Sequence, residues 1–217
     1  EVDQEKLYKP KDAYRIRGAG GMESLTAGTN LPNGVIVHYF LPNFDEEEDD
    51  VSLSFLSQDG SIIKEFSNNS KENSLKVKKG GNSFVWDMKY PGAKRINNMV
   101  LWSADFSGAK AVPNNYEVRL KVNGSELSQK FMILKNPNSE GTIDDIESQF
   151  NFVNEINGIV DKAHKAIINI RKIKEDLKKF QGDFTNNELA KDLIEKSKSI
   201  YESIDKVEKA RNDRPFL

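Results

Sequence analysis

The sequence predicts a β-sandwich followed by an α-helical hairpin, so that the chain is α+β in two segregated parts. Three observations carry this prediction. Apolar residues alternate with polar ones between residues 35 and 134, which is the period of half-buried strands. Gly, Pro and Asn separate these segments, as expected of short strands joined by tight turns. After residue 138 the apolar residues recur every three or four positions, which is the helical period.

The bulk properties exclude several classes of protein. The 217 residues suffice for one or two domains, and residues 1–140 and 141–217 each carry one more acid than base. Neither part is therefore a basic nucleic-acid module. No run of about 18 apolar residues is present, so we expect no membrane span. The absence of Cys removes disulfides, thiol catalysis and Cys-ligated zinc.

The first 28 residues are the least regular part of the chain. They contain Gly-rich stretches and little alternation. We interpret residues 1–28 as a linker, or as an arm whose strand pairs with a missing upstream domain. The β-sandwich is expected over residues 29–138 and the helical hairpin over residues 139–217.

About seven short strands are expected, an arrangement typical of a sandwich or a barrel. Residues 51–66 read as a hairpin around a turn at residues 58–61, and Asn123-Gly124 is the strongest hairpin signal in the chain. Trp86 alternates with polar neighbours and is expected in the core. The apolar residues expected on single strand faces are Val35, Val37, Tyr39, Val51, Leu53, Phe55, Phe84, Trp86, Met88, Tyr116, Val118, Leu120 and Val122.

Two long amphipathic helices are expected after residue 138. Thr142 is the expected N-cap of the first helix, and Gly182 the residue after its end. Residues 185–188, Thr-Asn-Asn-Glu, fit a capping box for the second helix. A short loop between such helices gives an antiparallel hairpin, which leaves a protein partner or a homodimer through the helices open.

No catalytic, cofactor or metal residues are assigned. The acidic run Asp45 to Asp50 lacks the spacing of an EF-hand and is interpreted as a solvated loop. Structural roles are expected for His38 and His164, since no nucleophile elbow accompanies them. Trp102 lies in a less regular stretch and is the one residue considered for contact with a ligand.

Three segments together resemble a known arrangement. They are TNLPNGVIVHYFL at residues 29–41, GGNSFVWDMKYPGA at residues 80–93 and AVPNNYEVRLKVNGSELSQKFMI at residues 111–133. These segments are similar to the C-terminal region of bacterial BNR-repeat (sortilin-like, "glycosyl hydrolase") β-propeller proteins, often from Bacteroidetes. The family usually has Pro-Gly-x-Tyr where this chain has Pro113-Asn114-Asn115-Tyr116, and Asn tolerates the same turn.

The resemblance implies an Ig-like sandwich and a helical tail downstream of a propeller, in a secreted, periplasmic or cell-surface protein. It implies no catalytic residues here, because the chain contains no Asp-box repeat. The expected function is a non-catalytic accessory module that braces the propeller or mediates protein interaction. The alternative is a carbohydrate- or surface-binding module that uses Trp102, and an enzyme in its own right is the third hypothesis.

Overall fold

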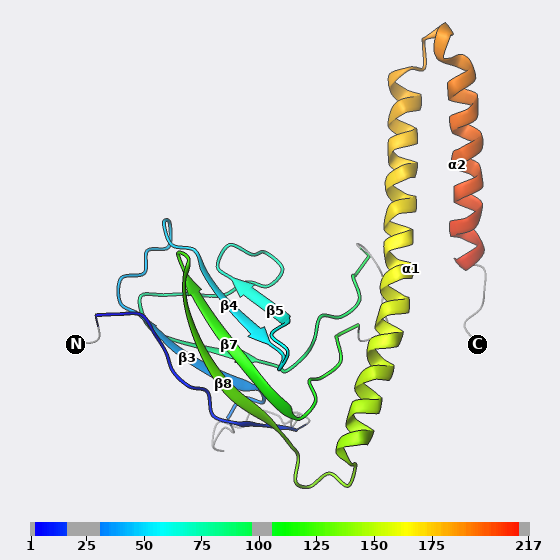
Figure 1. The fold of residues 1–217 in the computed structure, drawn as a ribbon. Coiled ribbons are helices and arrows are strands. Elements are labelled where there is room, and N and C mark those ends of the chain that lie inside the picture. Colours follow the sequence, from blue (N-terminus) through cyan, green and yellow to red (C-terminus); the bar gives the residue numbers. More distant parts are fainter. Residues whose placement is uncertain (1–2, 17–30, 97–105, 213–217) are drawn as a thin grey trace, which may run out of the picture. The chain divides into compact units, whose positions relative to one another are not determined.

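The computed structural model describes residues 3–16, 31–96 and 106–212. The chain forms two compact units. The first, β-rich unit contains residues 1–92 and 107–155, and the second, helical unit contains residues 93–106 and 156–217. The boundary falls within the first long helix, α1, so the β-rich unit includes the first turns of that helix (Figure 1). Each unit is described by itself.

In its described residues, the β-rich unit forms eight strands in two sheets. One sheet has the order β1-β3-β6 and the other the order β2-β8-β7-β4-β5. All neighbours are antiparallel except β2 and β8, which are parallel. The strands are β1 (Lys6–Leu7), β2 (Ala13–Arg15), β3 (Val35–Leu41), β4 (Val51–Leu56), β5 (Ile62–Ser67), β6 (Gly80–Trp86), β7 (Asn114–Val122) and β8 (Ser125–Lys135).

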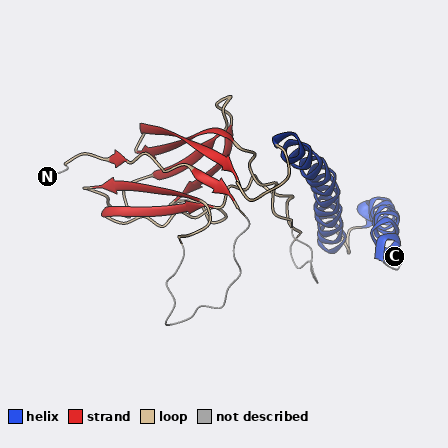
Figure 2. Cartoon of the chain, turned by 90° about the horizontal axis from the view of Figure 1, so that it is seen from below, coloured by secondary structure: helices blue, strands red, loops and turns tan. Residues whose placement is uncertain are grey.

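The two sheets form two layers around one core (Figure 2). Alternate side chains of β3 and β7 are buried, as the period-two pattern predicts, whereas β4 is buried at five of its six positions. Trp86 is fully buried and stacks on Phe55, with ring centroids 4.5 Å apart, so its expected core position is confirmed. The predicted α+β class is also confirmed, and the paired sheets are compatible with a β-sandwich.

The hairpin turns form where the sequence predicts them. Asn123 and Gly124 have φ angles of 47° and 94° and join β7 to β8. Such left-handed values at both turn positions explain the Asn-Gly pair, because most other residues are strained there. The Asn123 side chain also accepts a hydrogen bond from the Asp50 backbone N–H. Residues 51–67 form the second expected hairpin, with Gly60 at φ 83°.

Residues 3–16 differ from the expected arm. β1 pairs with β3, and β2 pairs with β8, so this segment completes the sheets of the same chain. Asp12 accepts a hydrogen bond from the Met132 backbone N–H, which anchors the segment between its two strands. Strands of two and three residues are too short to produce a visible alternation, which explains why the sequence reads as irregular there.

The helices are α1 (Ile143–Asp183), the 3₁₀-helix η1 (Glu188–Ala190) and α2 (Lys191–Asn212). Thr142 caps α1 as predicted, because its Oγ1 accepts the Asp145 backbone N–H. Gly182 lies inside α1, so its expected position after the helix was wrong. The expected capping box was also wrong. Asn187 caps η1 by accepting the Leu189 N–H, whereas Thr185 donates its hydroxyl to the Gln181 carbonyl.

Candidate interaction surface on the helical hairpin

The part of α1 that belongs to the helical unit repeats its apolar residues in alternating steps of three and four. Such spacing is that of the a and d positions of a coiled coil. In α2, three apolar residues stand seven apart, at Leu193, Ile200 and Val207. The α1 residues at these spacings are Ile156, Ile159, Ala163, Ala166, Ile170, Ile173, Leu177 and Phe180.

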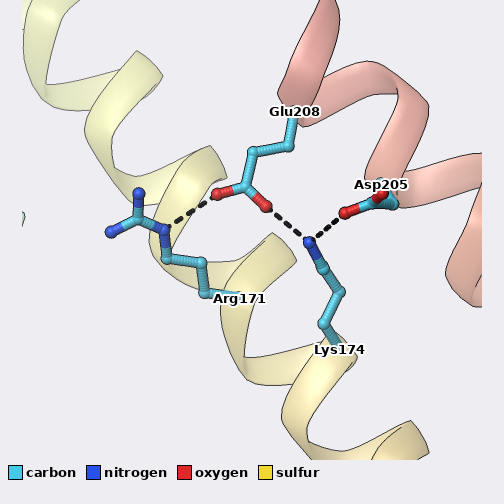
Figure 3. Close-up of polar contacts among 4 residues, drawn as sticks. All are labelled: Arg171, Lys174, Asp205 and Glu208. Atoms are coloured by element: carbon cyan, nitrogen blue, oxygen red, sulfur yellow. Dashed lines mark hydrogen bonds and ion pairs between the residues drawn. The ribbon is translucent and has the colours of Figure 1, made fainter. Parts of the chain in front are cut away.

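A four-residue ion-pair network joins the two helices (Figure 3). Lys174 Nζ lies 2.6 Å from Asp205 Oδ1 and 2.9 Å from Glu208 Oε2. Arg171 Nε donates to Glu208 Oε1 at 3.0 Å. Three of these side chains are largely shielded from solvent, at 16% exposure for Lys174, 23% for Asp205 and 20% for Glu208. Shielding strengthens the attraction compared with a fully exposed pair.

The network changes the titration of its members. Hydrogen bonds to Asp205 and then to Glu208 raise the pKa of Lys174 above its ordinary value. Hydrogen bonds from Lys174 and then from Arg171 lower the pKa of Glu208. Lys174 and Lys178 also lie over the Tyr201 ring, 5.2 and 5.3 Å from its centroid. Lys174 and Lys178 therefore help to hold the hairpin together and have a structural role.

A polar contact near the turn fixes the same pairing. Gln181 Nε2 donates to Ser197 Oγ at 3.0 Å, and Ser197 in turn donates to the Ile194 carbonyl. Ser197 is buried but satisfied, so it costs little stability. Steps forward along α1 are matched by nearly equal steps back along α2, which is antiparallel pairing (Figure 1). Because α2 ends at Asn212, it accompanies α1 back only to about residue 167.

One side of this hairpin is apolar and exposed. The exposed Ile159 and Ile173 of α1, and Leu193, Ile200 and Val207 of α2, lie on the same side of the residues that join the two helices, as the helical period and antiparallel pairing require. Ile156, five turns before Lys174, borders this side. Ile159 is 61% exposed and Val207 65%. The surface, called the apolar surface below, consists of Ile156, Ile159, Ile173, Leu193, Ile200 and Val207.

Residues 93–96 pack against α1 on a different side. Lys94 donates its backbone N–H to Asp161 Oδ1 at 3.0 Å, and its carbonyl meets His164 Nδ1. His164 is buried, and its ring packs edge-on against Phe106, with centroids 5.1 Å apart. Both backbone groups of Lys94 are thus bound by side chains one helical turn apart. His164 has a structural role, as expected.

The residues singled out in the sequence have different positions. Trp102 lies outside the described residues. The acidic run folds into turns, in which Asp49 accepts the Asp45 N–H at 2.8 Å and the Asn123 amide at 2.6 Å. These two hydrogen bonds lower the pKa of Asp49, the first more than the second. Across residues 3–16, 31–96 and 106–212, no group of three or more His, Asp or Glu is arranged to hold a metal.

Some of the polar contacts that hold the helical unit together could not be predicted from the sequence. The polar partners Asp205, Glu208 and Ser197 look like solvated residues, because the pairing of the helices decides their environment. The clamp by Asp161 and His164 was also missed. Its one signal is a lone His three residues after an Asp inside an apolar helix, which is too common to identify a contact with residue 94.

No family model matches the sequence, and neither the comparison with curated proteins nor the comparison with solved structures finds a match. In the described part of the chain, no helix combines the length and the apolar character needed to cross a bilayer.

Proposed function

We propose that this chain is a non-catalytic accessory module of a larger secreted BNR-repeat propeller protein. In this proposal the β-rich unit is an Ig-like sandwich that braces the propeller, and the helical hairpin mediates protein interaction. The membership in such a protein, and with it the location outside the cell or in the periplasm, is inferred from the resemblance of residues 29–41, 80–93 and 111–133 to that family. The apolar surface of the hairpin is the observation that carries the proposal.

The path of the chain between the two sheets supports the Ig-like assignment. β3 and β6 belong to one sheet, whereas β4, β5, β7 and β8 belong to the other, so the chain crosses between the sheets repeatedly. Such crossings are typical of the Greek-key connections of Ig-like sandwiches. In addition, Tyr116 near the start of β7 donates its hydroxyl to the Val112 carbonyl at 2.7 Å, four residues upstream. This is the geometry of the tyrosine corner of these domains.

The interaction role is supported by what the hairpin leaves exposed. Isolated apolar residues on a surface are ordinary, but a contiguous apolar patch on two helices marks a site of association. Here the charged residues Lys174, Asp205 and Glu208 are consumed in pairing α1 with α2, and the large aliphatic side chains beside them stay accessible. In a helix pair that needs no partner, the apolar side chains lie between the helices and the charged side chains face solvent.

Thiol labelling tests this role, because the chain has no Cys. Ile173→Cys places a thiol on the apolar surface, and Lys172→Cys places an exposed control thiol on a different side of α1. We expect maleimide to label position 173 at least tenfold more slowly in the larger protein than in a dilute solution of the isolated chain, since a partner covers it. Position 172 should react equally in both. Equal rates at position 173 would overturn the interaction role.

A carbohydrate- or surface-binding module is the second candidate. A shallow hollow of about 630 Å³ on the β-rich unit is lined by Tyr8, His38, Lys76 and Asn82, among others. An exposed aromatic ring beside hydrogen-bonding side chains suits a sugar. Glycan-array screening of the chain and of Tyr8→Ala distinguishes the two candidates. Binding that Tyr8→Ala removes favours the second, and an array without signal leaves the first.

A further inference from the structure

We propose that a second copy of this chain covers the apolar surface, with α1 of the two copies antiparallel and centred near Asn169. This inference deepens the proposed function, on which it rests, by naming the partner. It explains an asymmetry of the hairpin. α1 carries apolar residues from 156 onward, whereas α2 accompanies it only from about residue 167. Ile156 and Ile159 therefore project beyond the described part of α2, and Ile159 does so on the side where Ile173 is also exposed.

The side chains along α1 are complementary in size to those of a second α1 that runs in the opposite direction. An antiparallel pair of helices places a positions against d positions of the partner. With the pair centred on residues 168–169, this arrangement places the two small residues of the a and d positions against large residues of the partner. The layers pair Ile156 with the partner's Phe180, Ile159 with the partner's Leu177, Ala163 with the partner's Ile173, and Ala166 with the partner's Ile170.

The charges beside these a and d positions are complementary in the same register. Lys162, Asn169 and Asp176 stand seven apart and follow the outer edge of the apolar surface, away from α2. All three are exposed. A two-fold axis near Asn169 brings Lys162 beside the partner's Asp176 and Asp176 beside the partner's Lys162. A parallel pairing would instead place these positions beside e positions of the partner, and the match of Lys162 with Asp176 would be lost.

The same register covers the exposed apolar side chains of both helices of one hairpin. Ile173 of α1 and Ile200 and Val207 of α2 are at least 45% exposed. The antiparallel pairing lays the partner's residues 156–164 along these side chains. Each copy then contributes the exposed start of its helical unit to this side of the other, so that both exposed regions are covered by one two-fold contact.

The size of the contact sets the affinity that we expect. Residues 156–180 span about 36 Å, and an α-helix with its side chains is about 10 Å wide. With the adjoining face of α2, each copy buries roughly 600 Å², below the ~800 Å² per partner of a standard interface. We therefore expect a dimer that dissociates in the micromolar range.

Sedimentation equilibrium of the intact 217-residue chain between about 1 and 200 µM measures this directly. Wild type should shift from monomer to dimer, and Ile159→Glu should stay monomeric with an unchanged helical circular dichroism signal. Lys162→Asp and Asp176→Lys should each raise the dissociation constant about tenfold, because each places like charges together. The double reversal should restore wild-type affinity. A monomer at the highest concentration, or no recovery in the double variant, overturns the proposal.

Oxidative cross-linking tests the orientation independently. Asn169→Cys should form a disulfide-linked dimer, whereas Lys172→Cys on another side of α1 should not. Efficient cross-linking of Ile159→Cys to its own copy would show a parallel pairing and refute this register. The interaction role of the hairpin is tested separately from its self-association. If the chain is monomeric but the thiol of the Ile173→Cys variant is protected in the larger protein, the partner is a different protein, and only the self-association is wrong.

Discussion

Lys174 of α1 and Asp205 of α2 form an ion pair between the two helices of the hairpin, with 2.6 Å between Nζ and Oδ1. The same ammonium also binds Glu208, so one cation faces two carboxylates in a largely shielded position. This contact fits the register in which α2 returns along α1 and therefore stabilises the alignment of the apolar surface.

Replacing Lys174 by Ala should destabilise the hairpin. The substitution removes the cation that Asp205 and Glu208 both bind, so we expect a loss of about 1–3 kcal/mol in the free energy of unfolding. Urea unfolding followed by circular dichroism at 222 nm measures it. Lys172→Ala, at an exposed position of the same helix, should change the value by less than about 0.5 kcal/mol. Equal effects of the two variants would contradict a role of the network in stability.

The stability of the hairpin should depend on pH through Glu208. The pKa of this carboxyl is lower in the folded chain than its ordinary value of 4.5, so folding favours the ionised form. Its contribution is present above about pH 4.5 and is lost as the pH falls through the folded pKa. Urea unfolding at pH 7 and pH 3.5 should therefore show a smaller loss for Glu208→Gln than for wild type. Parallel losses in the two proteins would contradict this.

At high pH, deprotonation of Lys174 removes the contribution of the ion-pair network to the stability of the hairpin. Its pKa is raised above 10.5, so its contribution is complete below about pH 10.5 and is lost as the pH rises through the folded pKa. The network should thus stabilise the hairpin most between about pH 5 and 10.

Much of the β-rich unit could be predicted, because its cause is local. Val35, Val37 and Tyr39 alternate with more exposed residues on one strand, and a strand with one buried face has no other pattern. The turn at Asn123-Gly124 is specified by two residues that accept positive φ. In contrast, β1 and β2 are identified only by their partners, and the sequence does not contain the register with β3 and β8.

The candidate surface could also be predicted only in part. The apolar stripe of α1 is visible in the sequence, since Ile156, Ile159 and Ile173 recur at helical spacing. Which of these side chains stay exposed is not visible, because it depends on where α2 lies. The pairing of Lys174 with Asp205, 31 residues apart, follows from the length of the turn and from Asn187 as the cap.

Removal of the His164 side chain should loosen the helical unit. His164→Ala opens a cavity beside Phe106 and leaves the Lys94 carbonyl without its partner, so we expect a loss of about 2–4 kcal/mol. His164→Phe retains the ring volume but not the hydrogen bond, and its loss should be smaller. Urea unfolding followed at 222 nm compares both with the exposed control Lys179→Ala. Wild-type stability of His164→Ala would show that the contact with Lys94 contributes nothing.

The hydroxyl of Tyr116 should be worth a measurable part of the stability of the β-rich unit. Tyr116 is 3% exposed, and burial is the main cause that raises the pKa of its hydroxyl. Tyr116→Phe removes the hydrogen bond to Val112 without opening a cavity. The free energy of unfolding should fall by about 1–2 kcal/mol in urea, followed by the fluorescence of Trp86 in the adjacent core. Tyr14→Phe, at a half-exposed ring, is the matched control and should be neutral. A neutral Tyr116→Phe would remove the energetic basis for a tyrosine corner and weaken the Ig-like assignment.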